Sequence, residues 1–278
     1  TRRLVVPGLT PVTTPAASWN AALREHGGHL LQSWEGGEFK SHIGWQPERI
    51  SVRTPDGEAH AQVLFRQRGP LSLGYIPRGP VIAGDADRVW PALREELDRV
   101  AKRHRAISVI IEPDVETGLT LTHREAGVVP GPAHLQPGRT VKIPLLDDDA
   151  ILKQMHQKTR YSVRLATRRG VEVDVKAPGD SEALKHFYAM MLDTAERNEF
   201  AVHAYEYYER FLETFGDDAF FVFAHSEGHV AAAVIAACFG EHAVYMYGAS
   251  STEHRGHGAA FLLQFEAMKW ARERGCAT

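Results

Sequence analysis

Positively charged side chains recur at helical spacing in the middle of the chain, and this stretch is well suited to bind an anion. Arg160 and Arg164 lie four residues apart, and Lys153 falls two turns earlier on the same face. Such a face can bind the phosphates of a nucleic acid. It can equally be a solvated helical surface, which is the common role of a basic stripe. The candidates are Lys153, Lys158, Arg160, Arg164 and Arg168.

The chain as a whole is not basic. It has 32 lysines and arginines against 35 aspartates and glutamates, for a formal net charge of −3 at pH 7. A nucleic-acid partner must therefore bind to a local patch such as residues 153–169, because the overall field does not attract phosphate.

A second candidate for anion binding is the turn RGHGAA at residues 255–260. Arg255, Gly258 and Ala260 fit an R-x-x-G-x-A pattern between an expected strand and an expected helix. In acyl-CoA N-acyltransferases of the GNAT class, such a turn offers backbone N–H groups to a pyrophosphate at the helix N-terminus. An ordinary loop-to-helix junction explains the six residues about equally well.

Other candidates have an ordinary interpretation beside the functional one. Arg78 lies in a Pro-Arg-Gly-Pro turn, which can present a guanidinium to phosphate or carboxylate, but a solvated arginine in a tight turn is simpler. Lys40 lies in a short expected helix and would ordinarily face solvent. Tyr208, Tyr245 and Tyr247 occur in aromatic-rich stretches, where tyrosines more commonly pack than bind substrate.

Metal, redox and membrane functions have little support in the composition. The two cysteines, Cys238 and Cys276, form no disulfide framework, and the 15 histidines form no HxxxH pair on an expected helix. No apolar run approaches the roughly 20 residues of a spanning helix, and the N-terminus lacks the apolar stretch of a secretory signal. Thr1 in place of methionine suggests a trimmed or partly observed start. We therefore expect a cytoplasmic protein with no metal.

Strands and helices alternate along both halves of the chain. The first half is expected to hold strands at 50–53, 59–66, 71–76 and 106–112, and helices at 35–45, 87–105 and 117–125. The strand at 106–112 is expected to be buried. A loop rich in Pro and Gly at residues 127–138 predicts a boundary between a first domain, 1–138, and a second domain, 139–278.

The second domain is expected to open with a strand from Val141 to Leu145, followed by one helix that starts at three aspartates and ends at Gly170. The further expected elements are strands at 171–175, 219–224, 230–239 and 242–247, and helices at 181–197, 205–215 and 259–274. The predicted fold class is α/β (α+β), with two units that are each a twisted mixed sheet flanked by helices.

Five stretches in order resemble the Fem family of aminoacyl-tRNA-dependent peptidyltransferases, which build the interpeptide bridge of bacterial peptidoglycan. The most specific is KTRYSVRLATRRGVEV at 158–173, followed by YMYGASSTEHR at 245–255 and FLLQFEAMKWARERG at 261–275. LQSWEGGEFK at 31–40 and YIPRGPV at 75–81 match signatures of the family's first domain.

The resemblance implies tandem GNAT-like domains, with a cell-wall precursor in a cleft between or beside them. Lys40 matches a family lysine that meets the diphosphate of the precursor, and Tyr208 matches a tyrosine that helps to hold it. Tyr247 matches a second tyrosine, with Tyr245 as the alternative, and Arg78 joins the substrate-binding candidates through its signature. The basic stretch is assigned to phosphates of tRNA or of the precursor.

The chain departs from the family pattern at several positions. Ala204 stands where the family usually has an arginine, and Ile82 and Ala83 replace an acidic residue after the GPV motif. A family lysine that steadies the tetrahedral intermediate would lie beyond Thr278. The last strand and tail of the second domain are expected to be missing for the same reason.

The implied reaction moves an amino acid from aminoacyl-tRNA to the side-chain amine of a peptidoglycan stem peptide, with UDP-MurNAc-pentapeptide or lipid II as acceptor. It needs no cofactor, and the sequence identifies no catalytic residue. No transmembrane segment is expected, although a lipid-linked acceptor would imply peripheral membrane contact. Two rivals remain open: an acyl-CoA-dependent GNAT N-acetyltransferase, and a non-catalytic protein that binds the cell-wall precursor.

Overall fold

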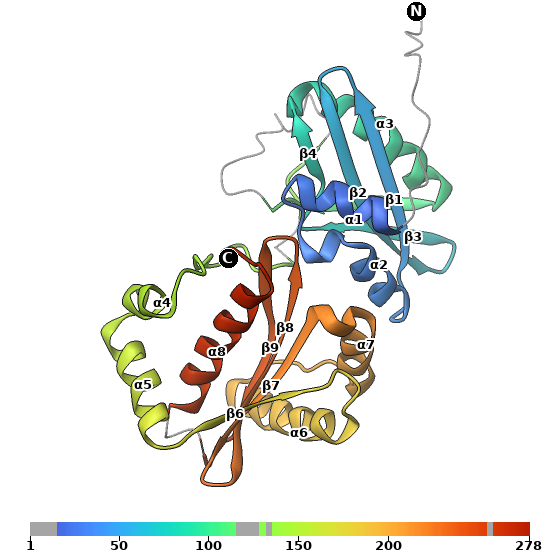
Figure 1. Cartoon of the computed structure of the whole chain (residues 1–278). Helices are drawn as coiled ribbons and strands as arrows, with labels where there is room; N and C mark the ends of the chain where they lie inside the picture. The colour runs from blue at the N-terminus through green and yellow to red at the C-terminus, as the bar shows by residue number, and fades with distance from the viewer. Residues whose placement is uncertain (1–15, 115–127, 132–134, 255–257) are drawn as a thin grey trace, which may run out of the picture. The chain divides into compact units, whose positions relative to one another are not determined.

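The computed structural model describes residues 16–114, 128–131, 135–254 and 258–278 (Figure 1). It divides into two compact units, Thr1–Thr140 and Val141–Thr278, and each unit is described by itself. None of the helices in the described ranges is both long enough and apolar enough to cross a bilayer.

The first unit is built on a mixed sheet whose strands run in the order β1-β2-β3-β5, with β4 also paired to β2. The β3–β5 pair is parallel and the other pairs are antiparallel. The strands are β1 (Gln46–Thr54), β2 (Gly57–Arg68), β3 (Leu71–Pro77), β4 (Val81–Gly84) and β5 (Ala106–Glu112). The sequence prediction missed the short β4.

Side chains of β2 alternate between two different environments, as the twofold period of a strand requires. Ala59, Ala61 and Val63 enter an apolar core with helix α3 (Ala86–Arg103). The intervening polar side chains face the opposite side, where α1 (Ala16–Glu25), η1 (Leu30–Gln32) and α2 (Trp34–Ser41) lie (Figure 1). The first sheet thus has one apolar face and one face on which buried hydrogen bonds accompany apolar side chains such as Trp19 and Phe39.

The edge position of β5 corrects one expectation. The strand at 106–112 exists, but it was wrongly expected to be buried: Ile107 is largely exposed, because β5 is the last strand in the sheet order. The helix predicted at 117–125 lies outside the described residues.

The second unit has a sheet in the order β6-β7-β8-β9, and all pairs among its described strands are antiparallel. A mixed sheet was expected in both units, and the described strands form one in the first unit only. These strands are β6 (Glu172–Lys176), β7 (Ala219–Ser226), β8 (His229–Phe239) and β9 (His242–Ser250). The helices are α4 (Asp148–Gln154), α5 (Gln157–Arg168), α6 (Ser181–Asn198), α7 (Tyr205–Phe215), the short η2 (Gly216–Asp218) and α8 (Ala259–Glu273).

The two faces of this sheet are covered by different helices (Figure 1). Val222 and Val234 pack with residues of α4, α5 and α8. Phe221 faces the other way and meets Phe187 of α6, with ring centroids 5.8 Å apart. The face toward α6 carries aromatic side chains such as Phe221, whereas the face toward α8 combines Val222 and Val234 with Phe220, whose ring stacks on Trp270.

The start of the second unit overturns two predictions. No strand forms over residues 139–145: Val141 is exposed, and the segment runs as an irregular chain to Asp147, which caps α4 by accepting from Ala150 N at 2.9 Å. The single predicted helix is two helices, because Met155 is extended and His156 starts α5 afresh, its Nδ1 accepting from Lys158 N at 3.2 Å.

Candidate functional site

Lys40 lies in the last turn of α2, where it is partly buried and its Nζ lies 5.0 Å from the centre of the Phe39 ring. The helix begins at Ser33, whose Oγ accepts from Gly36 N at 2.9 Å. A residue preceding α2, Gln32, is fully buried, and its Nε2 donates to Pro77 O at 2.7 Å. Two of the sequence signatures of the first unit, 31–40 and 75–81, are thereby bonded to each other.

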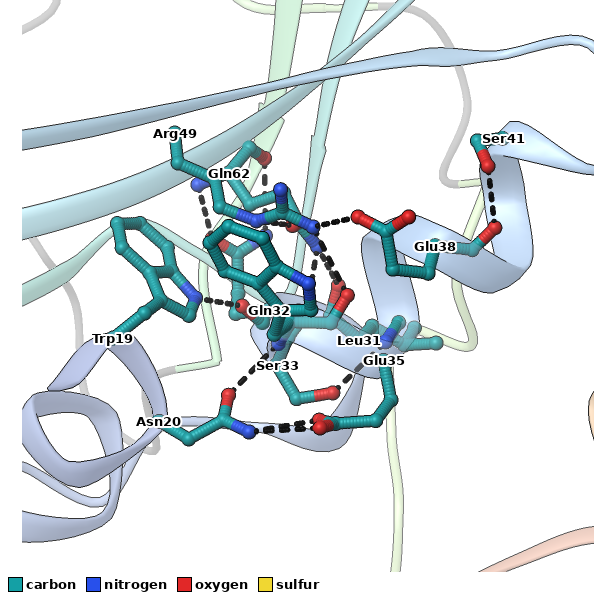
Figure 2. Close-up of polar contacts among 12 residues, drawn as sticks. Trp19, Asn20, Leu31, Gln32, Ser33, Glu35, Glu38, Ser41, Arg49 and Gln62 are labelled. Carbon is teal, nitrogen blue, oxygen red and sulfur yellow. Dashed lines mark hydrogen bonds and ion pairs between the residues drawn. The ribbon is translucent and has the colours of Figure 1, made fainter. Parts of the chain in front are cut away.

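Arg49 of β1 and Gln62 of β2 hold α2 against the sheet (Figure 2). Arg49 Nη2 donates to Trp34 O at 3.0 Å and to Glu38 Oε1 at 2.9 Å, while its Nε donates to Gln62 Oε1 at 2.9 Å. Gln62 Nε2 in turn donates to Ser33 O at 3.0 Å. Burial lowers the pKa of Arg49, and the neighbouring Glu38 carboxylate counteracts that effect. We call Gln32, Arg49, Gln62 and Glu38 the polar network.

The glycine pair of the LQSWEGGEFK signature has a packing explanation in this network. A Cβ at Gly37 would lie 2.2 Å from Gln62 Oε1 and 2.6 Å from Arg49 Nη2. Only a residue without a side chain lets α2 approach the two strands closely enough for these hydrogen bonds. The signature therefore encodes how the Lys40 helix is positioned, which the sequence analysis did not recognise.

Arg78 is engaged inside the first unit. Its backbone has a φ of 51°, and the side chain is partly buried, with Nη2 donating to Pro137 O at 2.9 Å and Nη1 lying 3.5 Å from Asp114 Oδ1. Glu112 holds the same segment by accepting from Leu135 N at 2.7 Å. The described contacts of Arg78 anchor residues 135–137, and its predicted contact with substrate stays a prediction.

Tyr208 of α7 and Tyr247 of β9 meet in the second unit. Their ring centroids are 5.1 Å apart and nearly perpendicular, and Tyr247 Oη donates to Tyr207 Oη at 3.1 Å. Tyr208 is only 2% exposed, and this burial raises the pKa of its phenol to about 12. Burial also raises the pKa of Tyr247. Both phenols are therefore neutral hydrogen-bond donors at physiological pH.

A register shift between β8 and β9 separates the two tyrosines that the sequence treated as alternatives. Tyr247 pairs with Ile235 and Tyr245 pairs with Ala236, so a bulge at Met246 turns the two tyrosine side chains to opposite faces. Tyr245 is 54% exposed, whereas Tyr247 belongs to the cluster around Tyr208. The geometry groups Tyr247, and not Tyr245, with Tyr208.

The basic stretch is divided between two helices. Lys153 belongs to α4, and the others belong to α5. Arg160 is partly buried, and its Nη1 donates to the carbonyls of Leu152 and Met155 at 3.3 and 3.4 Å, so it caps the end of α4. The remaining basic side chains of α5 are exposed, together with Tyr161 at spacings of three or four residues. These exposed residues are Lys158, Tyr161, Arg164 and Arg168, and we call them the α5 face.

The predicted anion-binding turn is described only in part, since Arg255 lies outside the described residues. Gly258 precedes α8 with a φ of 76°, and a Cβ there would lie 2.7 Å from Ser162 O of α5. Ala260 is exposed. The glycine thus allows the start of α8 to approach α5, which is a packing requirement independent of any anion.

Comparison with known proteins decides the family. A model of the FemAB family matches residues 18–130 and 132–228. The chain belongs to the FemAB family. The match includes Lys40, Arg78, Tyr208 and the α5 face, whereas Tyr245, Tyr247 and the turn before α8 lie beyond it.

Two relatives define what this FemAB protein is similar to. The lipid II:glycine glycyltransferase of Staphylococcus aureus is 32% identical over 216 residues, which cover 72% of this chain and 50% of that protein. The chain thus spans about half the length of the curated relatives it matches. The crystal structure of FemX has a TM-score of 0.82 at 22% identity, with 97% of this chain and 87% of that chain covered. The fold is that of FemX, with tandem GNAT-like units.

Proposed function

We propose that this FemAB protein transfers an aminoacyl group from aminoacyl-tRNA to the side-chain amine of a peptidoglycan stem peptide. The observation that carries the proposal is the 32% identity, over 72% of the chain, to a protein named lipid II:glycine glycyltransferase. The substrates of the proposed reaction are polyanions with separate binding needs, and the chain offers separate candidates for each.

Lys40 is the candidate for the diphosphate of the precursor. Its helix is fixed by the polar network, so the ammonium group is presented from a rigid support. Preorganisation of this kind reduces the entropy lost on binding. Tyr208 and Tyr247 are the candidates in the second unit. The neutral phenol of Tyr208 can donate a hydrogen bond to a phosphate or sugar oxygen, and Tyr247, which donates to Tyr207, packs against the Tyr208 ring.

The α5 face is the candidate for tRNA. It combines three exposed cations with the exposed ring of Tyr161, and the Arg168 guanidinium lies 5.9 Å from the centre of that ring. Cations that follow a phosphate backbone beside an aromatic ring that can stack on a base are a usual combination in nucleic-acid binding. Arg160 is not part of this proposal, because it caps α4.

The proposed reaction is an acyl transfer from an activated ester to an amine. The stem-peptide amine attacks the ester carbonyl of the aminoacyl-tRNA, the C–N bond forms, and the C–O bond to the tRNA ribose breaks. The amine loses a proton and the released ribose hydroxyl gains one. Because the ester is already activated, the protein accelerates the step mainly by positioning both substrates and stabilising the oxyanion.

One rival is favoured by a specific observation. Ala204 starts α7 without a side-chain hydrogen bond to the helix, at a position where the resemblance to the family implies an arginine. A protein that has lost this arginine can retain a precursor site without catalysis. The acyl-CoA rival is weaker, since the glycine of its proposed turn is explained by packing against Ser162.

A transfer assay with two donors tests the proposal. The purified chain is incubated with UDP-MurNAc-pentapeptide or detergent-solubilised lipid II, and with tRNA charged with radiolabelled amino acids or with radiolabelled acetyl-CoA. The proposal predicts label on the acceptor from charged tRNA in an amide that resists ester-cleaving base. Label from acetyl-CoA alone would establish the first rival. Precursor binding by calorimetry without transfer from either donor would establish the binding protein.

A further inference from the structure

A cluster of metal-binding side chains lies in the first unit, on the polar face of β2. It consists of His26, which follows α1, and of Glu58 and His60, which lie two residues apart on β2 and so point to the same side. His26 Nε2 lies 2.8 Å from Glu58 Oε1, and His60 Nε2 lies 3.9 Å from the same oxygen. One potential ligand atom from each residue lies within 4.8 Å of the other two.

His60 provides the observation that points to a ligand. The residue is 6% exposed, and its Nε2 is buried without a hydrogen-bond partner among the described residues. A buried imidazole nitrogen left unpaired costs about 1–3 kcal/mol, so such a group in a folded protein requires an explanation. The nitrogen lies 3.9 Å from Glu58 Oε1, which is beyond hydrogen bonding, in a group whose ligand atoms all lie within 4.8 Å of one another and so can share an ion.

The neighbouring strand β1 orients two of the three candidate ligands. Ser51 pairs with His60 across the strands, and its Oγ lies 3.0 Å from His60 Nδ1, so the ring can donate Nδ1–H to the serine and keep the Nε2 lone pair for a ligand. Arg53 pairs with Glu58, and its Nε and Nη2 donate to Glu58 Oε2 at 2.9 and 2.6 Å. Glu58 Oε1 is left facing both imidazoles.

We propose that His26 Nε2, Glu58 Oε1 and His60 Nε2 bind a zinc ion. Two imidazoles and one carboxylate form a donor set that suits Zn²⁺ and does not suit Mg²⁺ or Ca²⁺, which prefer oxygen. Ligands of a tetrahedral zinc lie about 3.3–3.6 Å apart, since each is about 2.0–2.2 Å from the metal. The observed 2.8 and 3.9 Å bracket that value.

The ion would take the position of the proton shared between His26 and Glu58, and a water molecule would complete the tetrahedron. Solvent can deliver the metal, because the side chains of His26 and Glu58 are each 19% exposed. The site would join the end of α1 to β2. Its function would be to stabilise the first unit, since none of its ligands belongs to the candidate substrate residues.

Zinc content and thermal stability test the proposal. The tag-free chain is stripped with EDTA, incubated with zinc sulfate, passed through a desalting column and analysed by mass spectrometry for metal. The expected result is about one zinc per chain and a melting temperature that rises with zinc concentration. His26→Gln is expected to weaken zinc binding at least about tenfold and to abolish the melting shift.

His104→Gln is the matched control. His104 Nε2 forms the same 2.8 Å contact with a glutamate, Glu48, and no second imidazole is described beside that pair. This variant is expected to bind zinc like the wild type. Equal zinc content in the wild type and His26→Gln, or no zinc retained by the wild type, would overturn the proposal. His26 follows α1 and is only partly buried, so its replacement decides the question even if His60→Gln fails to fold.

Discussion

The two units hold their candidate substrate residues by different physical means. In the first unit, α2 is fixed by directional hydrogen bonds among Gln32, Arg49, Gln62 and Glu38, and Lys40 depends on that helix. In the second unit, Tyr208 is held mainly by ring packing against Phe187, Tyr188 and Tyr247. The first arrangement should be sensitive to the loss of single polar atoms, and the second to the loss of volume.

The largest effect is expected where volume is lost in the aromatic cluster. Tyr208→Ala removes a ring that is 2% exposed and should lower the free energy of unfolding by about 3–5 kcal/mol, as for other buried aromatic truncations. Tyr208→Phe keeps the volume and should leave stability nearly unchanged while weakening precursor binding. Urea denaturation of both variants measures the difference. Equal losses of stability would show that the hydroxyl, rather than the packing, holds α7.

The polar network should lose stability when polar atoms are removed, even if the volume of the side chain is kept. Gln62→Met keeps the length of the side chain but removes the Gln62 partner of the Leu31 carbonyl and of Arg49 Nε, while the Ser33 carbonyl keeps its bond from Gly37 N. We expect a loss of about 2–3 kcal/mol from these unpaired groups. Gln67→Met on the exposed end of the same strand is the control and should be nearly neutral. If both variants are equally stable in urea, the network does not fix α2.

Lys40→Ala should affect binding and not folding. Loss of one charge-assisted contact with a diphosphate should weaken binding of UDP-MurNAc-pentapeptide by about 1.5–3 kcal/mol, which is about ten- to hundredfold. Calorimetry at low salt measures the change, with exposed Lys102→Ala on α3 as the control. Unchanged affinity would make Lys40 an ordinary surface lysine.

The smallest effect is expected from a substitution that adds one hydrogen bond to the second unit, at the start of α7. Ala204 precedes α7 in an extended conformation and forms no side-chain cap. Ala204→Ser supplies a hydroxyl that can accept from a backbone N–H of the first turn and should stabilise the protein by about 1 kcal/mol. A rise in melting temperature checks this expectation. A serine variant less stable than the wild type would mean that the start of α7 has another constraint.

The spacing of apolar residues was sufficient to predict most helices and strands, because the residues that face a core recur at a regular spacing within each element. The alternation along β2 and the helical spacing along α3 both correspond to the observed core. The break at Met155 was not predictable from charge, since the basic residues continue across it. The strand expected from Val141 to Leu145 depended on three alternating apolar residues, but Val141 is exposed and Leu145 packs against a small buried cluster without pairing in a strand.

The candidate sites were less predictable, because they depend on contacts between distant residues. Gln32 and Gln62 are 30 positions apart, and nothing in either local stretch indicates that their side chains meet. The bulge that separates Tyr245 from Tyr247 adds one residue to β9, and alternation alone gives both tyrosines the same face. Glu58 and His60 were visible as a strand pair, but their spacing of two residues differs from the HxxxH spacing of a helical metal motif, and His26 is distant from both in the sequence.

The most direct test of the proposed function is a steady-state transfer assay that compares Lys40→Ala with Arg164→Ala. We expect Lys40→Ala to raise the KM for UDP-MurNAc-pentapeptide and leave the KM for charged tRNA unchanged. Arg164→Ala on the α5 face should do the reverse, and its tRNA affinity should depend on salt with a slope reduced by a little under one. Arg160→Ala should instead lower the melting temperature, since Arg160 caps α4. If both variants raise the KM for the same substrate, or if neither variant changes either KM, the assignment of the two regions to two substrates is contradicted.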